Sequence, residues 1–256
     1  MESLKNKIIF ITGANSGIGK ACAYKFAKEG ARLIISARRL NLIEEVAADL
    51  RKEYNVDVFA FKLDVKNRKD VINTVQTLPN EWKGVDILIN NAGLARGFDK
   101  FYDDNPDDWD EMIDTNIKGL LYVTHAILPG MIERKGGHII NIGSIAGHEA
   151  YPKGAVYCAT KYAVNAITRS LRMDIIDKNI LVSTIDAGLV ETNFSKIRFH
   201  GDEEKAKNVY KGLTPLTGED VADAVLYCCS RPLHVNISEI TLLAARQANA
   251  SIAYRE

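Results

Sequence analysis

A short apolar run, followed by a glycine-rich turn and a helical segment, constrains the fold of this chain more than any other feature. The run is Lys7–Thr12, the turn Gly13–Gly19 reads GANSGIG, and a helical pattern follows over Lys20–Lys28. Glycines let a backbone approach a pyrophosphate closely, and the first free N–H groups of the next helix favour its negative charge. The order strand, glycine turn, helix therefore predicts a nucleotide site, although a tight connection alone would use the same glycines.

The rest of the chain alternates short β-branched runs with helical segments, which is typical of a parallel sheet covered on both faces. Including the first run, we predict strands at Lys7–Thr12, Arg32–Ala37, Asp57–Lys62, Asp86–Asn90, His138–Gly143, Leu181–Ala187 and Ile237–Leu243. Further helices are expected to begin near Leu40, Asn67, Asp107, Ala155 and Gly218. Right-handed crossovers then give an α/β fold, a Rossmann-type doubly wound sheet of about seven strands forming one catalytic domain over residues 1–256.

Composition and charge agree with such an enzyme. The 256 residues are 46% hydrophobic and 26% charged, and 33 basic side chains balance 33 acidic ones. A formal net charge of zero gives no reason to expect nucleic acid or an anionic membrane as a partner. We find no signal-peptide core and no run of the ~20 apolar residues that span a bilayer, so a cytoplasmic location is expected. The four cysteines fit neither a disulfide framework nor a metal site, and no metal is expected.

Tyr157 and Lys161 lie four residues apart in a predicted helix, and Ser144 lies thirteen residues before the tyrosine. A phenol and an amine at this spacing share one helix face. A nearby ammonium favours the phenolate and lowers the pKa of the phenol toward neutrality, as an acid/base residue requires. Taken alone the pair is a weak signal, because the same spacing occurs on solvated helices, and Ser144 alone is a typical cap or turn hydroxyl.

Together these segments resemble the short-chain dehydrogenase/reductase family from about Lys7 to about Leu243. The matching motifs, in order, are TGANSGIG at residues 12–19, Asp64, NNAG at residues 90–93, Asn116, Ser144, Tyr157 and Lys161. The resemblance implies that Tyr157 is the general acid/base and that Ser144 holds the substrate oxygen. It also implies that Lys161 lowers the pKa of the tyrosine and contacts the nicotinamide ribose, and that Asn116 carries a water-linked proton relay.

The end of the second predicted strand indicates NADP rather than NAD as the cofactor. Arg38 and Arg39 stand where NAD enzymes place an acid on the ribose, and guanidiniums can hold a 2′-phosphate with forked hydrogen bonds. They could instead only cover the start of a surface helix, and many NADP-preferring relatives carry a basic residue where this chain has Asn15. The resemblance implies a cofactor site made of Gly13, Asn15, Ser16, Gly17, Ile18, Gly19, Arg38, Arg39, Asp64, Val65, Asn91, Ala92, Gly93, Tyr157, Lys161, Gly188, Val190 and Thr192.

The chain departs from the family after the sixth predicted strand, where Ala187-Gly188 replaces the usual Pro-Gly. Gly188 and Thr192 stand at the family positions, and Thr192 resembles the residue that holds the nicotinamide carboxamide. The missing proline therefore puts the rigidity of this loop in doubt rather than its function. The long irregular stretch from about Glu191 to Leu216 is predicted to be a substrate lid.

Several segments look specifically like the family branch that oxidises serine, L-allo-threonine and other 3-hydroxy acids such as 3-hydroxypropionate with NADP. These segments are residues 78–82, 86–95, 108–116, 127–131 and 234–237. A 3-hydroxy acid carries a carboxylate, which needs a cation or several N–H donors when it is buried. Arg198 in the lid is the candidate, while Arg96 and Lys153 compete for the role and a solvated loop arginine is an equal alternative.

Other functions remain open from the sequence. A ketoreductase of 3-oxoacyl thioesters, sugars or xenobiotic ketones would carry the same catalytic residues. A noncatalytic NADP sensor is disfavoured because both Tyr157 and Lys161 are present. Small molecules are the expected partners, and a homotetramer is expected because relatives commonly form one and the face near residues 155–176 is apolar.

Overall fold

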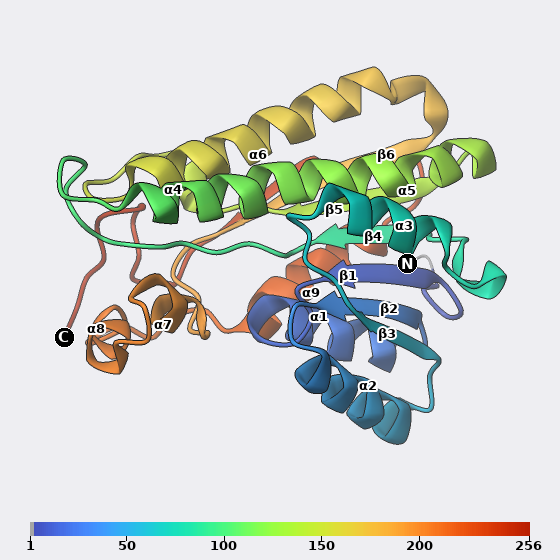
Figure 1. The fold of residues 1–256 in the computed structure, drawn as a ribbon, viewed down its shortest axis with the longest axis horizontal. Helices are drawn as coiled ribbons and strands as arrows, with labels where there is room; N and C mark the ends of the chain where they lie inside the picture. The colour runs from blue at the N-terminus through green and yellow to red at the C-terminus, as the bar shows by residue number, and fades with distance from the viewer. Residues whose placement is uncertain (1–2) are drawn as a thin grey trace.

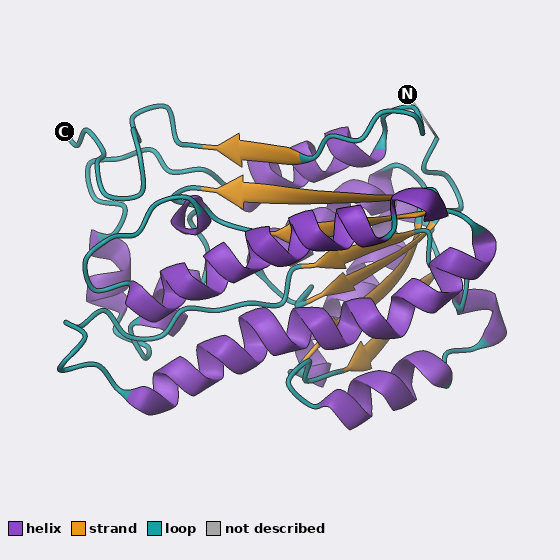
Figure 2. Ribbon diagram, turned by 90° about the horizontal axis from the view of Figure 1, so that it is seen from above, coloured by secondary structure: helices purple, strands orange, loops and turns teal. Residues whose placement is uncertain are grey.

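The computed structural model describes residues 3–256, and over this range seven strands form a parallel sheet in the order β3-β2-β1-β4-β5-β6-β7. The strands are β1 Ile8–Thr12, β2 Arg32–Ala37, β3 Val58–Lys62, β4 Ile87–Asn90, β5 Gly137–Ile142, β6 Ile180–Ala187 and β7 Glu239–Leu242. Their arrows point toward the same end of the molecule in Figure 2, where the connecting loops gather. The predicted doubly wound fold is confirmed, and each predicted strand is present with its ends shifted by at most two residues.

Helices cover both faces of the sheet (Figure 1). They are α1 Gly17–Lys28, α2 Leu40–Tyr54, α3 Arg68–Gln76, α4 Pro106–Ile113, α5 Leu120–Arg134, α6 Ala155–Asp174, α7 Phe194–Arg198, α8 Glu203–Asn208 and α9 Gly218–Cys229. The helices α1, α2 and α9 pack on one face, and α3 and α5 pack on the other, where α6 also lies. Two hydrophobic cores result, one on each side of the sheet.

The sequence of β1 shows why both faces are covered. Ile9 and Ile11 belong to the core beneath α1 and α9, while Ile8 and Phe10 belong to the core beneath α3 and α5. Successive side chains of a strand point to opposite faces, so an uninterrupted apolar run requires a partner layer on each side. Burial of each such side chain contributes roughly 1.5–3 kcal/mol.

The strand order reverses between β1 and β4. The chain moves from β1 outward through β2 and β3, then returns to place β4 on the other side of β1 and continues to β7. Ligands of doubly wound sheets bind in the crevice at the carboxyl ends of the two strands that flank this reversal. A crevice forms here because the connections that follow β1 and β4 leave toward opposite sides of the sheet.

The stretch 191–216, predicted to be irregular, contains the two short helices α7 and α8. The prediction was wrong on this point because helices of five and six residues are too short to show an apolar period. A local signal was present: Asp202 caps α8 by accepting a hydrogen bond from the backbone N–H of Lys205 at 3.0 Å. Within the described residues, no helix combines the length and the apolarity that crossing a bilayer requires.

Candidate active site

A cavity of about 1060 Å³ lies at the carboxyl ends of the strands, a volume typical of sites for cofactors with substrates. The glycine turn, the ends of β2, β4, β5 and β6, and the segment 191–216 all contribute to its wall. The predicted residues that line it are Gly13, Asn15, Ser16, Gly17, Ile18, Arg38, Arg39, Asp64, Val65, Asn91, Ala92, Gly93, Ser144, Tyr157, Lys161, Gly188, Val190, Thr192 and Arg198. Of the predicted set, Gly19 and Asn116 are not part of the wall.

The glycine turn has the backbone that the sequence predicts. Gly13 has φ +67°, and a Cβ atom there would lie 3.0 Å from the Cα atom of Ala92, so no side chain fits without strain. The Asn91 amide donates hydrogen bonds to the backbone oxygens of Thr12 at 2.9 Å and Gly13 at 3.1 Å. These contacts join the end of β4 to the end of β1, and they leave the first turn of α1 facing the cavity.

The donors of this turn fit the phosphates of a dinucleotide. The Nδ2 atom of Asn15 is buried and has no hydrogen-bond partner among the described residues, although Asn15 lines the cavity. A buried donor without an acceptor costs free energy, so an acceptor such as a phosphate oxygen at this position would be stabilising. Backbone N–H groups at the start of α1 add to the same preference.

Arg38 stands at the end of β2 with its guanidinium half exposed, and Arg39 is the residue before α2. Nη1 of Arg38 donates to Oε1 of Glu111 at 3.2 Å, and Nε of Arg96 donates to Oε2 of the same carboxylate at 2.7 Å. Burial acts to raise the pKa of Glu111, but the hydrogen bonds and charges of the two arginines hold it below its ordinary value. The predicted phosphate-binding arginine therefore has an acidic neighbour that no sequence motif indicated.

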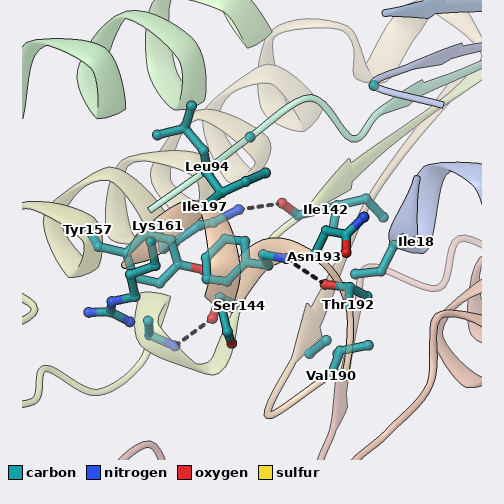
Figure 3. Close-up of a pocket in the computed structure, with 18 of the residues that line it drawn as sticks. Ile18, Leu94, Ile142, Ser144, Tyr157, Lys161, Val190, Thr192, Asn193 and Ile197 are labelled. Carbon is teal, nitrogen blue, oxygen red and sulfur yellow. Dashed lines mark hydrogen bonds between the residues drawn. The ribbon is translucent and has the colours of Figure 1, made fainter. Parts of the chain in front are cut away.

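Ser144, Tyr157 and Lys161 come together on one side of the cavity (Figure 3). Ser144 lies two residues after the end of β5, and its hydroxyl accepts a hydrogen bond from the Ala146 backbone N–H at 3.1 Å. Tyr157 and Lys161 project from the first turns of α6, and all three side chains are buried. The Lys161 ammonium donates to the backbone oxygen of Ile142 at 2.8 Å and lies 6.0 Å from the centre of the Tyr157 ring.

The pKa of Tyr157 differs from the sequence-based expectation. Burial raises it above the ordinary value and the neighbouring Tyr151 adds to this, while Ser144 and Arg198 lower it. The Lys161 ammonium is hydrogen-bonded to the Ile142 carbonyl instead of to the phenol. Burial also lowers the pKa of Lys161 to about 8, against the opposing charge of Asp186.

Asn116 lies in a short π-helical segment, Asp114–Gly119, between α4 and α5. Its oxygen accepts from the Leu94 backbone N–H at 2.9 Å, and its amide donates to the Leu94 oxygen at 2.8 Å and to the Thr160 hydroxyl at 3.1 Å. Leu94 lines the cavity and Asn116 does not. Asn116 therefore holds in place the part of the wall that Leu94 forms beside Tyr157. Segments of π-helix are frequent at functional sites.

Arg198 is placed in the cavity and beside the tyrosine. Its guanidinium carbon lies 5.6 Å from the centre of the Tyr157 ring, and its Nη1 atom donates to the Tyr151 hydroxyl at 2.9 Å. Of the competing cations, Arg96 is engaged with Glu111 and the Ile197 carbonyl, and Lys153 lies over the Phe98 ring. Tyr151 and Phe98 complete this wall, and neither carried a signal in the sequence.

The loop after β6 is held firmly without the family proline. Gly188 N–H donates to the Leu242 oxygen at 2.8 Å, and Leu189 N–H donates to the Gln247 side chain at 2.9 Å. Glu191 N–H then donates to the Leu216 oxygen at 2.8 Å. Tertiary hydrogen bonds therefore restrain this loop, which carries Ala187 before Gly188.

Comparisons with known proteins identify relatives of the chain. The sequence pattern described as short chain dehydrogenase matches residues 7–203. NADP-dependent 3-hydroxy acid dehydrogenase of Schizosaccharomyces pombe is 46% identical over 257 residues, covering 100% of this chain and 99% of the relative. Sulfoacetaldehyde reductase 2 of Chromohalobacter salexigens is 40% identical over 247 residues, covering 96% and 97% of the two chains.

The fold has a similarly complete match. The structure described as the closed form of serine dehydrogenase complexed with NADP⁺ superposes with a TM-score of 0.91 at 41% identity, over 97% of this chain and 99% of that one. The resemblance drawn from the motifs is confirmed. The chain belongs to the short chain dehydrogenase family.

Proposed function

We propose that this protein is an NADP-dependent dehydrogenase that interconverts short 3-hydroxy acids and their 3-oxo forms. One observation carries the choice of substrate: a cation, Arg198, shares the cavity with the proton-transfer residue Tyr157 at 5.6 Å from its ring centre. A short acid whose hydroxyl meets Tyr157 has a carboxylate within reach of that guanidinium. The names of the relatives, a 3-hydroxy acid dehydrogenase and a serine dehydrogenase with NADP⁺, support this reading.

NADP would be held by the glycine turn, by Arg38 and Arg39 at its phosphate, and by Thr192 at the carboxamide, and when bound it supplies the hydride acceptor or donor. In relatives by family resemblance, the aspartate at the position of Asp64 contacts the adenine, and Asp64 lines the cavity here. Its side chain accepts a hydrogen bond from the Lys66 backbone N–H at 3.1 Å, and the helix that follows is capped by Asn67. The chain's own residues thus bind and orient the cofactor.

The protein itself has to manage one proton and one oxygen. We assign Tyr157 as the group that takes the hydroxyl proton during oxidation and returns it during reduction. The Ser144 hydroxyl holds the same substrate oxygen by a hydrogen bond. Lys161 favours the phenolate form of Tyr157 when its ammonium turns toward the phenol. Asn116 keeps the Leu94 wall in place beside them.

A different anionic substrate is the second candidate. The relative named sulfoacetaldehyde reductase 2 implies a sulfonate, and the same guanidinium could pair with that group. A ketoreductase of uncharged carbonyls, the wider alternative, gives Arg198 no anion to bind. The segment 191–216 is proposed as the lid over either substrate, because Arg198 and Val190 bring it to the cavity wall. A homotetramer stays a prediction, to be measured by light scattering in solution.

The test is a substrate panel with a matched variant. NADPH formation is followed with L-serine, L-allo-threonine, 3-hydroxypropionate and a neutral secondary alcohol, each with NADP⁺ and with NAD⁺; sulfoacetaldehyde with NADPH forms a further arm. Turnover of the hydroxy acids with NADP⁺, lost in Tyr157→Phe, is the expected result. Turnover of the neutral alcohol alone would discard the acid substrates, and turnover of sulfoacetaldehyde alone would select the sulfonate.

A further inference from the structure

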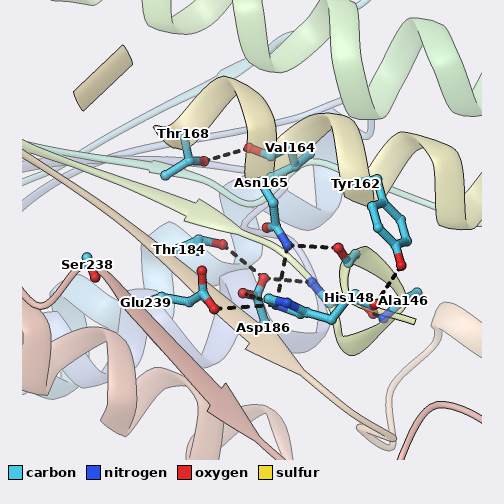
Figure 4. Close-up of polar contacts among 12 residues, drawn as sticks. Ala146, His148, Tyr162, Val164, Asn165, Thr168, Thr184, Asp186, Ser238 and Glu239 are labelled. Carbon is cyan, nitrogen blue, oxygen red and sulfur yellow. Dashed lines mark hydrogen bonds and ion pairs between the residues drawn. The ribbon is translucent and has the colours of Figure 1, made fainter. Parts of the chain in front are cut away.

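Asp186 is completely buried near the end of β6 and holds both ends of the catalytic loop, which we define as Ser144–His148 (Figure 4). Oδ1 of Asp186 accepts hydrogen bonds from the Ser144 backbone N–H at 3.1 Å and from the Thr184 hydroxyl at 3.0 Å. Oδ2 lies 2.8 Å from Nε2 of His148. One carboxylate therefore fixes the backbone at the start of the loop and the side chain at its end.

The surrounding chain is built to admit this carboxylate. Gly143 directly precedes the catalytic loop, and a Cβ atom at that position would overlap Oδ1 of Asp186. The α6 side of the loop is also tied, since the Asn165 amide donates to the Gly147 oxygen at 3.1 Å and the Tyr162 hydroxyl donates to the His148 oxygen. The loop is thus held between β6 and the helix that carries Tyr157.

The charged or titratable groups around Asp186 are His148, Lys161, Glu239 and Arg169. His148 contacts the carboxylate, Lys161 and Glu239 interact with it by charge, and Arg169 pairs with Glu239. Oε1 of Glu239 lies 3.7 Å from Nε2 of His148, and Arg169 donates to Oε2 of Glu239 at 3.1 Å. Burial raises the pKa of Asp186, and His148 and Thr184 act against that rise. The carboxylate charge in turn raises the pKa of Lys161, which burial lowers.

We propose that Asp186 is a positioning residue for the reaction, one that sets the place of Ser144 by accepting a hydrogen bond from its backbone N–H. It acts through Ser144, because Asp186 is not among the residues that line the cavity within the described chain. The inference rests on the catalytic roles proposed above for Ser144, Tyr157 and Lys161. His148 supports the carboxylate and takes no proton from substrate.

Two substitutions separate the hydrogen bond from the charge. Asp186→Asn keeps the size and one acceptor oxygen for Ser144 but removes the negative charge, whereas Asp186→Ala removes both. Ser183→Ala is the matched control, because Ser183 is equally buried in β6, hydrogen-bonds His138 at 2.8 Å, and has no hydrogen bond to the catalytic loop. For all three variants, Tm, kcat and KM for NADPH are measured with NADPH and malonate semialdehyde, the 3-oxo form of 3-hydroxypropionate.

Asp186→Ala is expected to lower kcat by about 100-fold, the loss typical of a misplaced catalytic group, with KM for NADPH unchanged. Asp186→Asn keeps an acceptor oxygen for the Ser144 N–H, so it is expected to lower kcat less than Asp186→Ala, again with KM for NADPH unchanged. If Asp186→Ala does not fold, the comparison of kcat between Asp186→Asn and Ser183→Ala still decides. Asp186 variants that lose only Tm, as Ser183→Ala does, would overturn the inference.

Ser144→Ala and Tyr157→Phe in the same assay distinguish a failure of the proposed catalytic roles from a failure of the positioning role of Asp186. Retained turnover in both would remove the proposed catalytic roles themselves. Turnover lost in both, together with unaltered kcat in the Asp186 variants, would remove only the positioning role.

Discussion

The guanidinium of Arg198 bridges two aromatic residues of the cavity, donating to the Tyr151 hydroxyl at 2.9 Å while lying 5.6 Å from the centre of the Tyr157 ring. A second contact, from Nε to the Gly97 oxygen at 3.1 Å, anchors the side chain to the loop after β4. The cation is thus held in place before any anion meets it. Such preorganisation reduces the cost of binding a small acid.

Arg198→Ala should raise KM for 3-hydroxypropionate by about 10- to 100-fold, the loss expected for a charge-assisted hydrogen bond of roughly 1.5–3 kcal/mol. KM for a neutral alcohol of similar size should change much less. Steady-state kinetics on both substrates checks this. Arg96→Ala is the control, since it removes another hydrogen bond to the lid, at the Ile197 oxygen, without removing the cation beside Tyr157. Equal losses on the acid and the alcohol in Arg198→Ala would contradict the role.

Arg38→Ala should weaken the binding of NADP⁺ far more than the binding of NAD⁺. The guanidinium stands at the end of β2 and lines the cavity, and a phosphate would compete with the Glu111 carboxylate for it. We expect KM for NADP⁺ to rise by about 10-fold or more, because a charge-assisted contact is lost. The check is the ratio of kcat/KM for the two cofactors. A variant with an unaltered ratio would leave Arg39 as the phosphate ligand.

The apolar runs made the sheet predictable, because both faces of a covered parallel strand must be apolar. Arg32–Ala37 was predicted with its observed ends, and the seven strands occur where the β-branched runs stand. The glycine turn and the residues Ser144, Tyr157 and Lys161 could be named in advance because a motif fixes their spacing. Their common cavity is a consequence of the fold that the runs specify.

The polar partners of the site could not be predicted in this way. Glu111 meets Arg38 across 73 residues, and Asp186 meets Ser144 across 42, so each pairing depends on tertiary packing rather than on local spacing. The raised pKa of Tyr157 was missed for the same reason, since its main cause is burial, which the YxxxK spacing does not show. Local patterns therefore predicted residues that share one cavity and left the polar surroundings of those residues undetermined.

Asn116→Ala should destabilise the protein and lower its kcat. The change leaves the buried backbone N–H and oxygen of Leu94 without their side-chain partner, at a cost of roughly 1–3 kcal/mol for each unsatisfied group. Tm is expected to fall by several degrees, and kcat should fall as the Leu94 wall loosens. Thermal unfolding and steady-state kinetics test both effects. Thr124→Val offers a comparison, because it removes a buried hydrogen bond to Asn90 within the core, at a distance from Leu94.

His138 should make the protein less stable as the pH falls. Its imidazole is buried in β5 beside Ser183, and burial lowers its pKa from 6.5 to about 4. A histidine with a depressed folded pKa binds its proton more readily when unfolded, so its contribution is fully present above pH 6.5 and is lost as the pH falls toward 4. The loss is on the order of 3 kcal/mol at full protonation. His138→Gln removes this titration. Between pH 7 and pH 5, Tm of the variant should therefore fall less than Tm of the parent protein. Parallel decreases in the two Tm values would show that other groups govern acid unfolding.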